Sequence, residues 1–180
     1  MLAKVNRSIT LHQGRVFRLV REDVTLKNGA NVQMDIIRHP GSSAIVPLPS
    51  ADRVILIRQY RHAIGDCLWE IPAGTLDPGE TPLECAKREL SEEAGFSATL
   101  WREMGRITPL PGYTDEQIYM FLATDLRPAE QKFDEDEMLQ VNEVPFDRAI
   151  AMVHEGTIRD SKTITGLFLA AEWVRAPDMR

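Results

Sequence analysis

The 180-residue sequence has only two cysteines, Cys67 and Cys85, and no apolar run near the ~18 residues needed to cross a bilayer. Two cysteines are too few for a disulfide scaffold, and they lack metal-ligand spacing, so they indicate thiols in a reducing compartment. The opening MLAKVNRSITLHQG contains no apolar core typical of a signal peptide. We therefore expect a cytoplasmic protein that has no membrane partner.

The chain also lacks a basic excess, because 27 acidic residues outnumber 21 basic residues and give a net charge of −6. Nucleic-acid binding usually needs a basic surface, so this balance argues against nucleic-acid partners, including an RNA-directed role. Aromatic residues make up only 7%, but 43% hydrophobic and 27% charged residues are typical of a folded globular protein. The length predicts a single domain over residues 1–180.

Local patterns predict strands interleaved with three helices. Asn28-Gly29 is a hairpin signal between strands expected at 15–26 and 32–38. Thr81 as N-cap, followed by Pro82 and Glu84, predicts a helix that runs to Ala94 and stops at Gly95. Further helices are expected at 145–154 and 164–174, and further strands at 43–47, 53–58, 99–107, 117–123 and 138–144. This order predicts an α/β fold with a mixed sheet.

The helix that starts after Thr81 gathers carboxylates. Glu89 and Glu93 are four residues apart, so they share one face, where like charges repel. A Gly/Pro loop precedes the helix, and oxygen ligands behind such a loop suit a hard divalent cation. An arbitrary Glu-rich helix would instead present a solvated acidic face, and the spacing of the whole segment decides between these interpretations.

The pattern G-x5-E-x7-R-E-L-x-E-E-x-G-F is complete from Gly74 to Phe96 and resembles the box of the Nudix hydrolases. The resemblance implies a Nudix-type α/β/α sandwich with a mixed sheet and an N-terminal antiparallel strand extension. It also implies hydrolysis of a nucleoside diphosphate linked to another moiety, with Mg²⁺ or Mn²⁺ as cofactor and water attacking phosphorus.

The resemblance assigns roles to the box residues. The implied metal ligands are Glu89, Glu93 and the backbone carbonyl of Ala73. Glu92 would bind the metal or lie next to it, Arg88 would orient the carboxylates, and Glu80 would brace the loop or reach a bridging water. Gly74 and Gly95 would permit the loop turn and the helix exit.

Three flanking features resemble the ADP-ribose pyrophosphatase branch of the family. In the first, Arg58-Gln59-Tyr60-Arg61 precedes Trp69-Glu70, which leads into the box. The resemblance implies that Arg61 grips the pyrophosphate through its guanidinium fork, with Arg58 and Glu70 as further substrate-binding residues. The second feature is Pro111-Gly112, placed fifteen residues after Phe96 and also assigned to substrate binding.

The third feature is the acidic run from Asp134 to Glu137. The resemblance implies that Glu135 is the general base and Glu137 a metal contact, or the reverse. Without the box, such a run would indicate a solvated loop. The four scattered histidines are expected to be structural, so no histidine is expected to act as the base.

The resulting prediction is a metal-dependent hydrolase that converts ADP-ribose to AMP and ribose 5-phosphate. A hydrolase of another nucleoside diphosphate sugar, such as GDP-mannose, is the first alternative, and a non-catalytic nucleotide-binding Nudix module is the second. Residues 43–180 would form the catalytic core, and residues 1–42 would help to build a homodimer. Phe17 or Tyr60 would stack on adenine.

Overall fold

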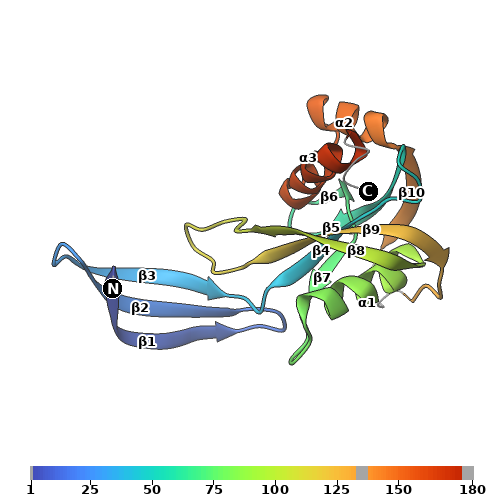
Figure 1. Cartoon of the computed structure of the whole chain (residues 1–180). Coiled ribbons are helices and arrows are strands. Elements are labelled where there is room, and N and C mark those ends of the chain that lie inside the picture. Colours follow the sequence, from blue (N-terminus) through green and yellow to red (C-terminus); the bar gives the residue numbers. More distant parts are fainter. Residues whose placement is uncertain (1, 133–137, 176–180) are drawn as a thin grey trace. The chain divides into compact units, whose positions relative to one another are not determined.

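The computed structural model describes residues 2–132 and 138–175 (Figure 1). The chain forms two compact units. The N-terminal unit combines Met1–Gly41 with Thr108–Gln117, and the main unit combines Ser42–Ile107 with Ile118–Arg180. Residues 108–117 fall within the catalytic core predicted over 43–180, whereas the structure groups this loop with the N-terminal strands. That the whole chain acts as one domain stays a prediction.

The N-terminal unit is built on a three-stranded antiparallel sheet in the order β1-β2-β3. Its strands are β1 (Ala3–Gln13), β2 (Arg18–Leu26) and β3 (Asn31–Arg38). The expected turn lies between β2 and β3, where Gly29 adopts a φ of 85° that favours glycine. Strand β1 was not predicted, and every one of its residues is exposed.

The main unit contains two sheets. Their strands are β4 (Ser42–Pro47), β5 (Arg53–Arg61), β6 (Asp66–Glu70), β7 (Ala73–Thr75), β8 (Phe96–Ile107), β9 (Ile118–Pro128) and β10 (Leu139–Pro145). One sheet has the order β10-β5-β6 and is antiparallel. The other has the order β7-β4-β9-β8 and is mixed, because β4 runs parallel to β9. The predicted mixed sheet is therefore confirmed.

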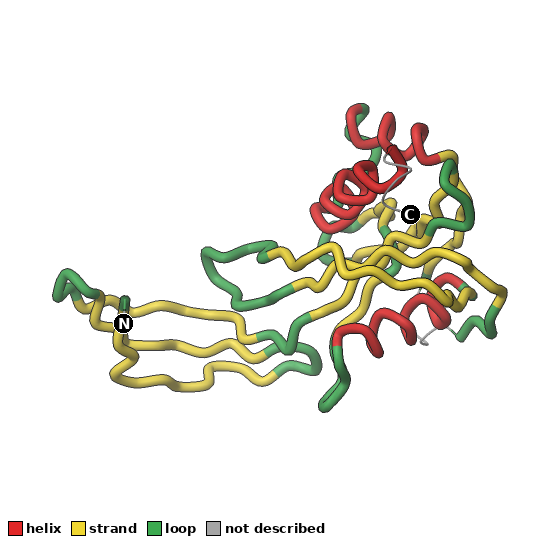
Figure 2. Tube along the Cα trace, in the orientation of Figure 1, coloured by secondary structure: helices red, strands yellow, loops and turns green. Residues whose placement is uncertain are grey.

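Helices cover both sides of the main unit's strands (Figures 1 and 2). They are α1 (Pro82–Ala94), α2 (Phe146–His154) and α3 (Ser161–Arg175). α1 packs on β4, β7 and β8, while α3 packs on β4, β6 and β9. This arrangement confirms the α/β/α sandwich. Among residues 2–132 and 138–175, no helix is long and apolar enough to span a membrane.

Strand β4 is buried on both faces because it lies between the two helix layers. Successive side chains point to opposite faces of a strand. Ile45 therefore joins an apolar cluster with Leu90 of α1, and its neighbour Val46 joins a cluster with Leu167 of α3. The two halves of the core meet at β4. Packing on this strand fixes the position of α1 and its carboxylates relative to the sheet.

Helix α3 approaches the sheet closely at Gly166. A Cβ atom at this position would lie 2.9 Å from Cδ1 of Ile71 and 3.0 Å from Cγ2 of Val46, closer than real Cβ contacts allow. The glycine therefore lets the helix backbone pack directly on the strands. This contact also positions the start of α3, which carries polar residues of the site.

Candidate active site

Local sequence signals place α1. The side chain of Thr81 accepts a hydrogen bond from the backbone N–H of Glu84, and the Glu84 carboxylate accepts one from the backbone N–H of Thr81. This capping box satisfies groups that a helix start leaves unpaired. Gly95 ends the helix with a left-handed φ of 73°. The predicted start and stop of the box helix are both confirmed.

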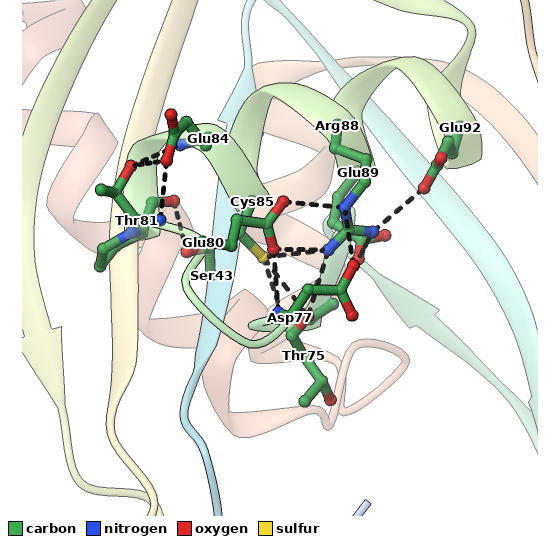
Figure 3. A network of polar contacts seen from close by, with 12 residues as sticks. Ser43, Thr75, Asp77, Glu80, Thr81, Glu84, Cys85, Arg88, Glu89 and Glu92 are labelled. Carbon is green, nitrogen blue, oxygen red and sulfur yellow. Dashed lines mark hydrogen bonds and ion pairs between the residues drawn. The ribbon is translucent and has the colours of Figure 1, made fainter.

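Arg88 ties the carboxylates of the box together (Figure 3). Its Nε and Nη2 donate to the two carboxylate oxygens of Glu80 at 2.9 and 3.0 Å. Its Nη1 donates to Glu89 at 2.6 Å and to Glu92 at 3.1 Å. The hydrogen bond with Glu80 raises the pKa of Arg88, and the same bond holds the pKa of Glu80 below its ordinary value. Arg88 is thus a fixed cation that orients three carboxylates.

Gly74 makes room for the carboxylate of Glu89. A Cβ atom on Gly74 would lie 1.7 Å from Oε1 of Glu89 and 2.0 Å from its carboxyl carbon. Gly74 is not among the described glycines that have a left-handed φ. The loop turn expected from the sequence therefore does not by itself explain why this residue is glycine. Glycine is needed at position 74 because the Glu89 side chain of α1 reaches the backbone of β7 there.

Glu93 is the more deeply buried of the two carboxylates on this face, with 1% of its surface exposed. Its Oε2 accepts a hydrogen bond of 2.8 Å from the backbone N–H of Ala73. The first residue of β7 and the α1 carboxylates therefore meet, as the predicted ligand set requires. The position of the Ala73 carbonyl as a metal ligand stays a prediction.

The donor chemistry fits a hard divalent cation, because Glu89 and Glu93 bring two nearly buried carboxylates to one place. Within the described part of the chain, no group of three or more His, Cys, Asp or Glu side chains forms a metal-binding cluster. A cation held here would be bound by these two side chains together with further oxygen ligands. Glu137, the other predicted ligand, and Glu135, the predicted base, lie outside the described residues.

A second charged cluster lies where β5, β6 and α3 meet. Arg61 donates from Nε and Nη2 to the two oxygens of Glu70, at 2.8 and 2.7 Å. Lys162 donates to Oε2 of the same carboxylate and, at 3.1 Å, to Asp160. Glu70 is 1% exposed. Burial raises its pKa, but the ion pairs with Arg61 and Lys162 outweigh burial, so the pKa of Glu70 lies below its ordinary value.

This cluster adds residues to which the sequence assigned no role. Glu70 is buried and paired with Arg61 and Lys162, and its part in substrate binding stays a prediction. Asp160 accepts hydrogen bonds from the N–H and the hydroxyl of Thr163, and that hydroxyl accepts one from the N–H of Ile71. Lys162 lies 92 residues after Glu70 in the chain, so no local sequence pattern relates the two residues.

The other predicted site residues are Arg58, Glu92, Pro111 and Gly112. Arg58 is exposed and points to the face of β5 opposite to Arg61, because the two are three residues apart on a strand. Pro111 and Gly112 are exposed in the loop of the N-terminal unit. Glu92 is partly exposed beside Arg88. Of the two arginines, Arg61 is therefore the one that the structure brings into the charged clusters.

A cavity of about 480 Å³ lies elsewhere in the main unit. It is lined mainly by apolar side chains, among them Leu48, Leu100, Trp101, Leu122 and Trp173. None of the box carboxylates lines it. The cavity and the charged clusters are therefore different features of the main unit.

An α/β/α domain whose glycine loop and carboxylate helix face a fixed arginine has the parts of a metal-dependent hydrolase. A NUDIX domain matches residues 38–167, which is 130 of the 180 residues. The chain therefore belongs to the NUDIX family, and the predicted membership of the Nudix hydrolases is confirmed.

Individual relatives cover most of the chain. The methanol dehydrogenase activator of Bacillus methanolicus is 34% identical over 163 residues, which cover 89% of this chain and 88% of the relative. The ADP-ribose pyrophosphatase of Bacillus subtilis (strain 168) is 36% identical over 155 residues, covering 85% and 84%. A crystal structure of an ADP compounds hydrolase matches with a TM-score of 0.85 and 26% identity, covering 97% of this chain and 95% of the other.

Proposed function

We propose that this protein hydrolyses ADP-ribose to AMP and ribose 5-phosphate with the help of Mg²⁺ or Mn²⁺. The observation that carries the proposal is the pair of nearly buried carboxylates, Glu89 and Glu93, set against the β7 backbone by Gly74 and Ala73. The relative named ADP-ribose pyrophosphatase supports the choice of substrate. A second relative of similar identity is the methanol dehydrogenase activator, so a direct test of the substrate is the decisive one.

The residues of the chain divide the work as follows. Glu89, Glu93, the carbonyl of Ala73 and Glu137 would hold the cation, with Glu92 beside them. A divalent cation bound there would neutralise pyrophosphate oxygens and lower the pKa of the attacking water. Arg88 keeps Glu89 and Glu92 in place through its hydrogen bonds. Glu135, or Glu137 if the roles are reversed, would take the proton from the water, worth typically about 10²–10⁴-fold in rate.

Arg61 would bind the pyrophosphate. Its described hydrogen bonds, both to Glu70, use two of the five N–H donors of a guanidinium, so three are available to phosphate oxygens. Glu70 and Lys162 would fix the orientation of this donor group. Pro111 and Gly112 are proposed as further substrate-binding residues on their loop.

The decisive experiment is a product assay on the purified protein. ADP-ribose, GDP-mannose and NADH are each incubated with Mg²⁺ and with chelator, and the nucleotide products are separated by chromatography. We expect AMP and ribose 5-phosphate from ADP-ribose only when the metal ion is present. Preferential cleavage of GDP-mannose would make GDP-mannose the substrate in place of ADP-ribose. A folded protein that cleaves none of the three compounds would favour a nucleotide-binding module.

We also propose a cytoplasmic homodimer that uses the sheet of the N-terminal unit. This sheet exposes apolar side chains that include Val5, Ile9, Leu11 and Met34. Exposed apolar groups gathered on one element are a feature of association surfaces. Light scattering coupled to gel filtration should give about twice the 20.3 kDa chain mass. Replacement of Val5 and Ile9 by lysine should give the monomer, and a wild-type monomer would contradict the proposal.

A further inference from the structure

Gln59 carries a buried polar atom for which the described residues provide no partner. The residue is 5% exposed, and its Oε1 accepts no hydrogen bond from any residue in 2–132 or 138–175. Among the buried side-chain oxygens and nitrogens of this described part, it is the one that lacks a partner. Most buried polar groups in proteins are hydrogen-bonded, so this exception needs an explanation.

The position of Gln59 on β5 relates it to the site. Residues two apart on a strand point to the same face, so Ile55, Gln59 and Arg61 form one row. Ile55 packs with Leu90 of α1 at one end of this row. Arg61, at the other end, binds the buried Glu70. Gln59 therefore lies between the α1 core and the proposed phosphate-binding arginine.

Electrostatics links the same end of the row to the proposed metal ligands. The pKa of Arg61 is raised first by its hydrogen bond with Glu70 and further by the negative charges of Glu93 and Asp160. Arg61 is therefore within electrostatic reach of Glu93. Gln59 lies two residues before Arg61 on the same face of β5, so its carboxamide is on the side of the strand that carries the proposed phosphate-binding guanidinium.

An unpaired buried oxygen destabilises a folded protein, by about 1–3 kcal/mol relative to a paired one. An apolar side chain of the same size would avoid this penalty. The penalty is relieved if the oxygen receives a hydrogen bond when substrate binds. Pyrophosphate oxygens only accept hydrogen bonds, so they cannot pair with Oε1. The donors next to the pyrophosphate of a nucleoside diphosphate sugar are the O–H groups of its sugars and of water.

We propose that Gln59 is a substrate-binding residue whose Oε1 accepts a hydrogen bond from an O–H group held between Arg61 and the α1 carboxylates. This inference rests on the proposed function. The O–H group belongs to a hydroxyl of the nucleoside diphosphate sugar or to a water in the active site. Both sources share the same chemistry, and steady-state kinetics separates them.

The test exploits opposite effects on stability and on activity. Gln59→Met keeps the length of the side chain and removes the unpaired oxygen. The thermal midpoint of the ligand-free variant should rise, while kcat/KM for the cleaved nucleoside diphosphate sugar should fall roughly 3- to 10-fold, as for one lost neutral hydrogen bond. A rise in KM alone would identify a substrate hydroxyl, and a fall in kcat alone would identify the water.

Two further variants make the result decisive. Gln59→Leu should also raise the thermal midpoint and lower kcat/KM. Agreement of the two variants would show that the result does not depend on how methionine packs. Gln140→Met changes an exposed glutamine on the neighbouring strand β10 and should alter neither quantity. Lower stability together with lower activity in both Gln59 variants would show a structural role and overturn the inference. Higher stability with unchanged kinetics would overturn it too.

Failure of the proposed function would be visible separately. If the wild-type protein cleaves no nucleoside diphosphate sugar, the activity proposal falls, and the Gln59 inference is then judged by binding. The rise in thermal midpoint caused by ADP-ribose with Ca²⁺ should be smaller in Gln59→Met than in the wild type. An equal rise in the two proteins would overturn the inference on its own.

Discussion

The Cα atom of Gly74 and the carboxylate of Glu89 are so close that a Cβ atom would lie 1.7 Å from Oε1. Gly74→Ala must therefore displace the Glu89 carboxylate from β7. We expect kcat to fall roughly 10²-fold or more, because a proposed metal ligand is moved, while the circular dichroism spectrum stays native. Full activity in a folded Gly74→Ala protein would contradict the ligand assignment.

Gly166→Ala serves as a contrast to this variant. The added methyl would press on Ile71 and Val46 and strain the packing of α3. Overpacking of this kind costs about 1–3 kcal/mol, so the thermal midpoint should fall. The Glu89 carboxylate is not touched, and a metal titration should give the same apparent affinity as the wild type.

Glu93→Gln should lower kcat roughly 10²-fold or more and weaken the apparent affinity for Mg²⁺, because it removes the charge of a buried carboxylate that we propose as a metal ligand. Glu84→Gln is the matched control, since it makes the same change on the same helix. Glu84 serves the capping box. Its replacement should reduce the unfolding free energy by about 1 kcal/mol or less without changing the Mg²⁺ titration.

The charge of Glu70 should make the free energy of unfolding depend on pH in the acid range. Its folded-state pKa lies below the ordinary value of 4.5, because its ion pairs outweigh its burial. A carboxylate of this kind stabilises the fold above its unfolded pKa, and the contribution is lost as pH falls through the folded pKa. Urea unfolding should therefore show that Glu70→Gln is less stable than wild type at pH 7, by about 2–3 kcal/mol, with the gap narrowing below pH 4.5. A constant gap would contradict the ionised state of Glu70.

Arg38 should hold the 108–117 loop. It donates to Asp115 at 3.0 Å and to Glu22 at 2.8 Å, and Asp115 also accepts the N–H of His39 at 2.9 Å. In Arg38→Ala, hydrogen exchange in the 108–117 peptide should become faster by roughly tenfold, because backbone opening is less opposed.

Arg21→Ala is the control for the Arg38 variant. Arg21 makes a two-pronged ion pair with Asp35 in the same sheet, and both bonds are 2.7 Å long. That pair makes no contact with the loop. Equal exchange rates of the loop peptide in the two variants would show that the sheet as a whole, and not Arg38, governs the loop.

The two cysteines should differ in reactivity. Burial raises the pKa of the Cys85 thiol to about 12, and the charges of Glu89 and Glu80 act in the same direction. The thiolate is the reactive form, so Cys85 should resist alkylation at pH 8 in the native protein. Cys67 is partly exposed and should react. Mass spectrometry after iodoacetamide treatment would show one modified site, and rapid labelling of Cys85 would contradict the packing around α1.

Sequence alone predicted the parts that depend on local signals. The ends of α1 follow from Thr81, Pro82 and Gly95, which act within a few residues of one another. Strand β1 was missed, although Val5, Ile9 and Leu11 alternate with polar residues, because the signal is weak and the strand is exposed on all its residues.

Long-range contacts were beyond the reach of sequence patterns. Lys162 and Glu70 are 92 residues apart, and no local rule brings their side chains together. The pairing of the Glu70 carboxylate with two cations could therefore not be predicted from the sequence. Gln59 belonged to a recognised motif, but its missing partner is a property of the folded surroundings and has no sequence signal.

The N-terminal unit is assembled from two separate stretches of the chain, and this affects how the protein can be recombined with its relatives. A chimera that takes residues 1–41 from another family member would keep Asp115 of this chain but take position 38 from the other protein. The loop would then pack against a strand with which its own contacts, such as Arg38 with Asp115, did not evolve. If residues 1–41 and 108–117 are exchanged together, both sides of these contacts come from the same parent protein. The stability of the loop should therefore be inherited with the paired segments and not with either alone.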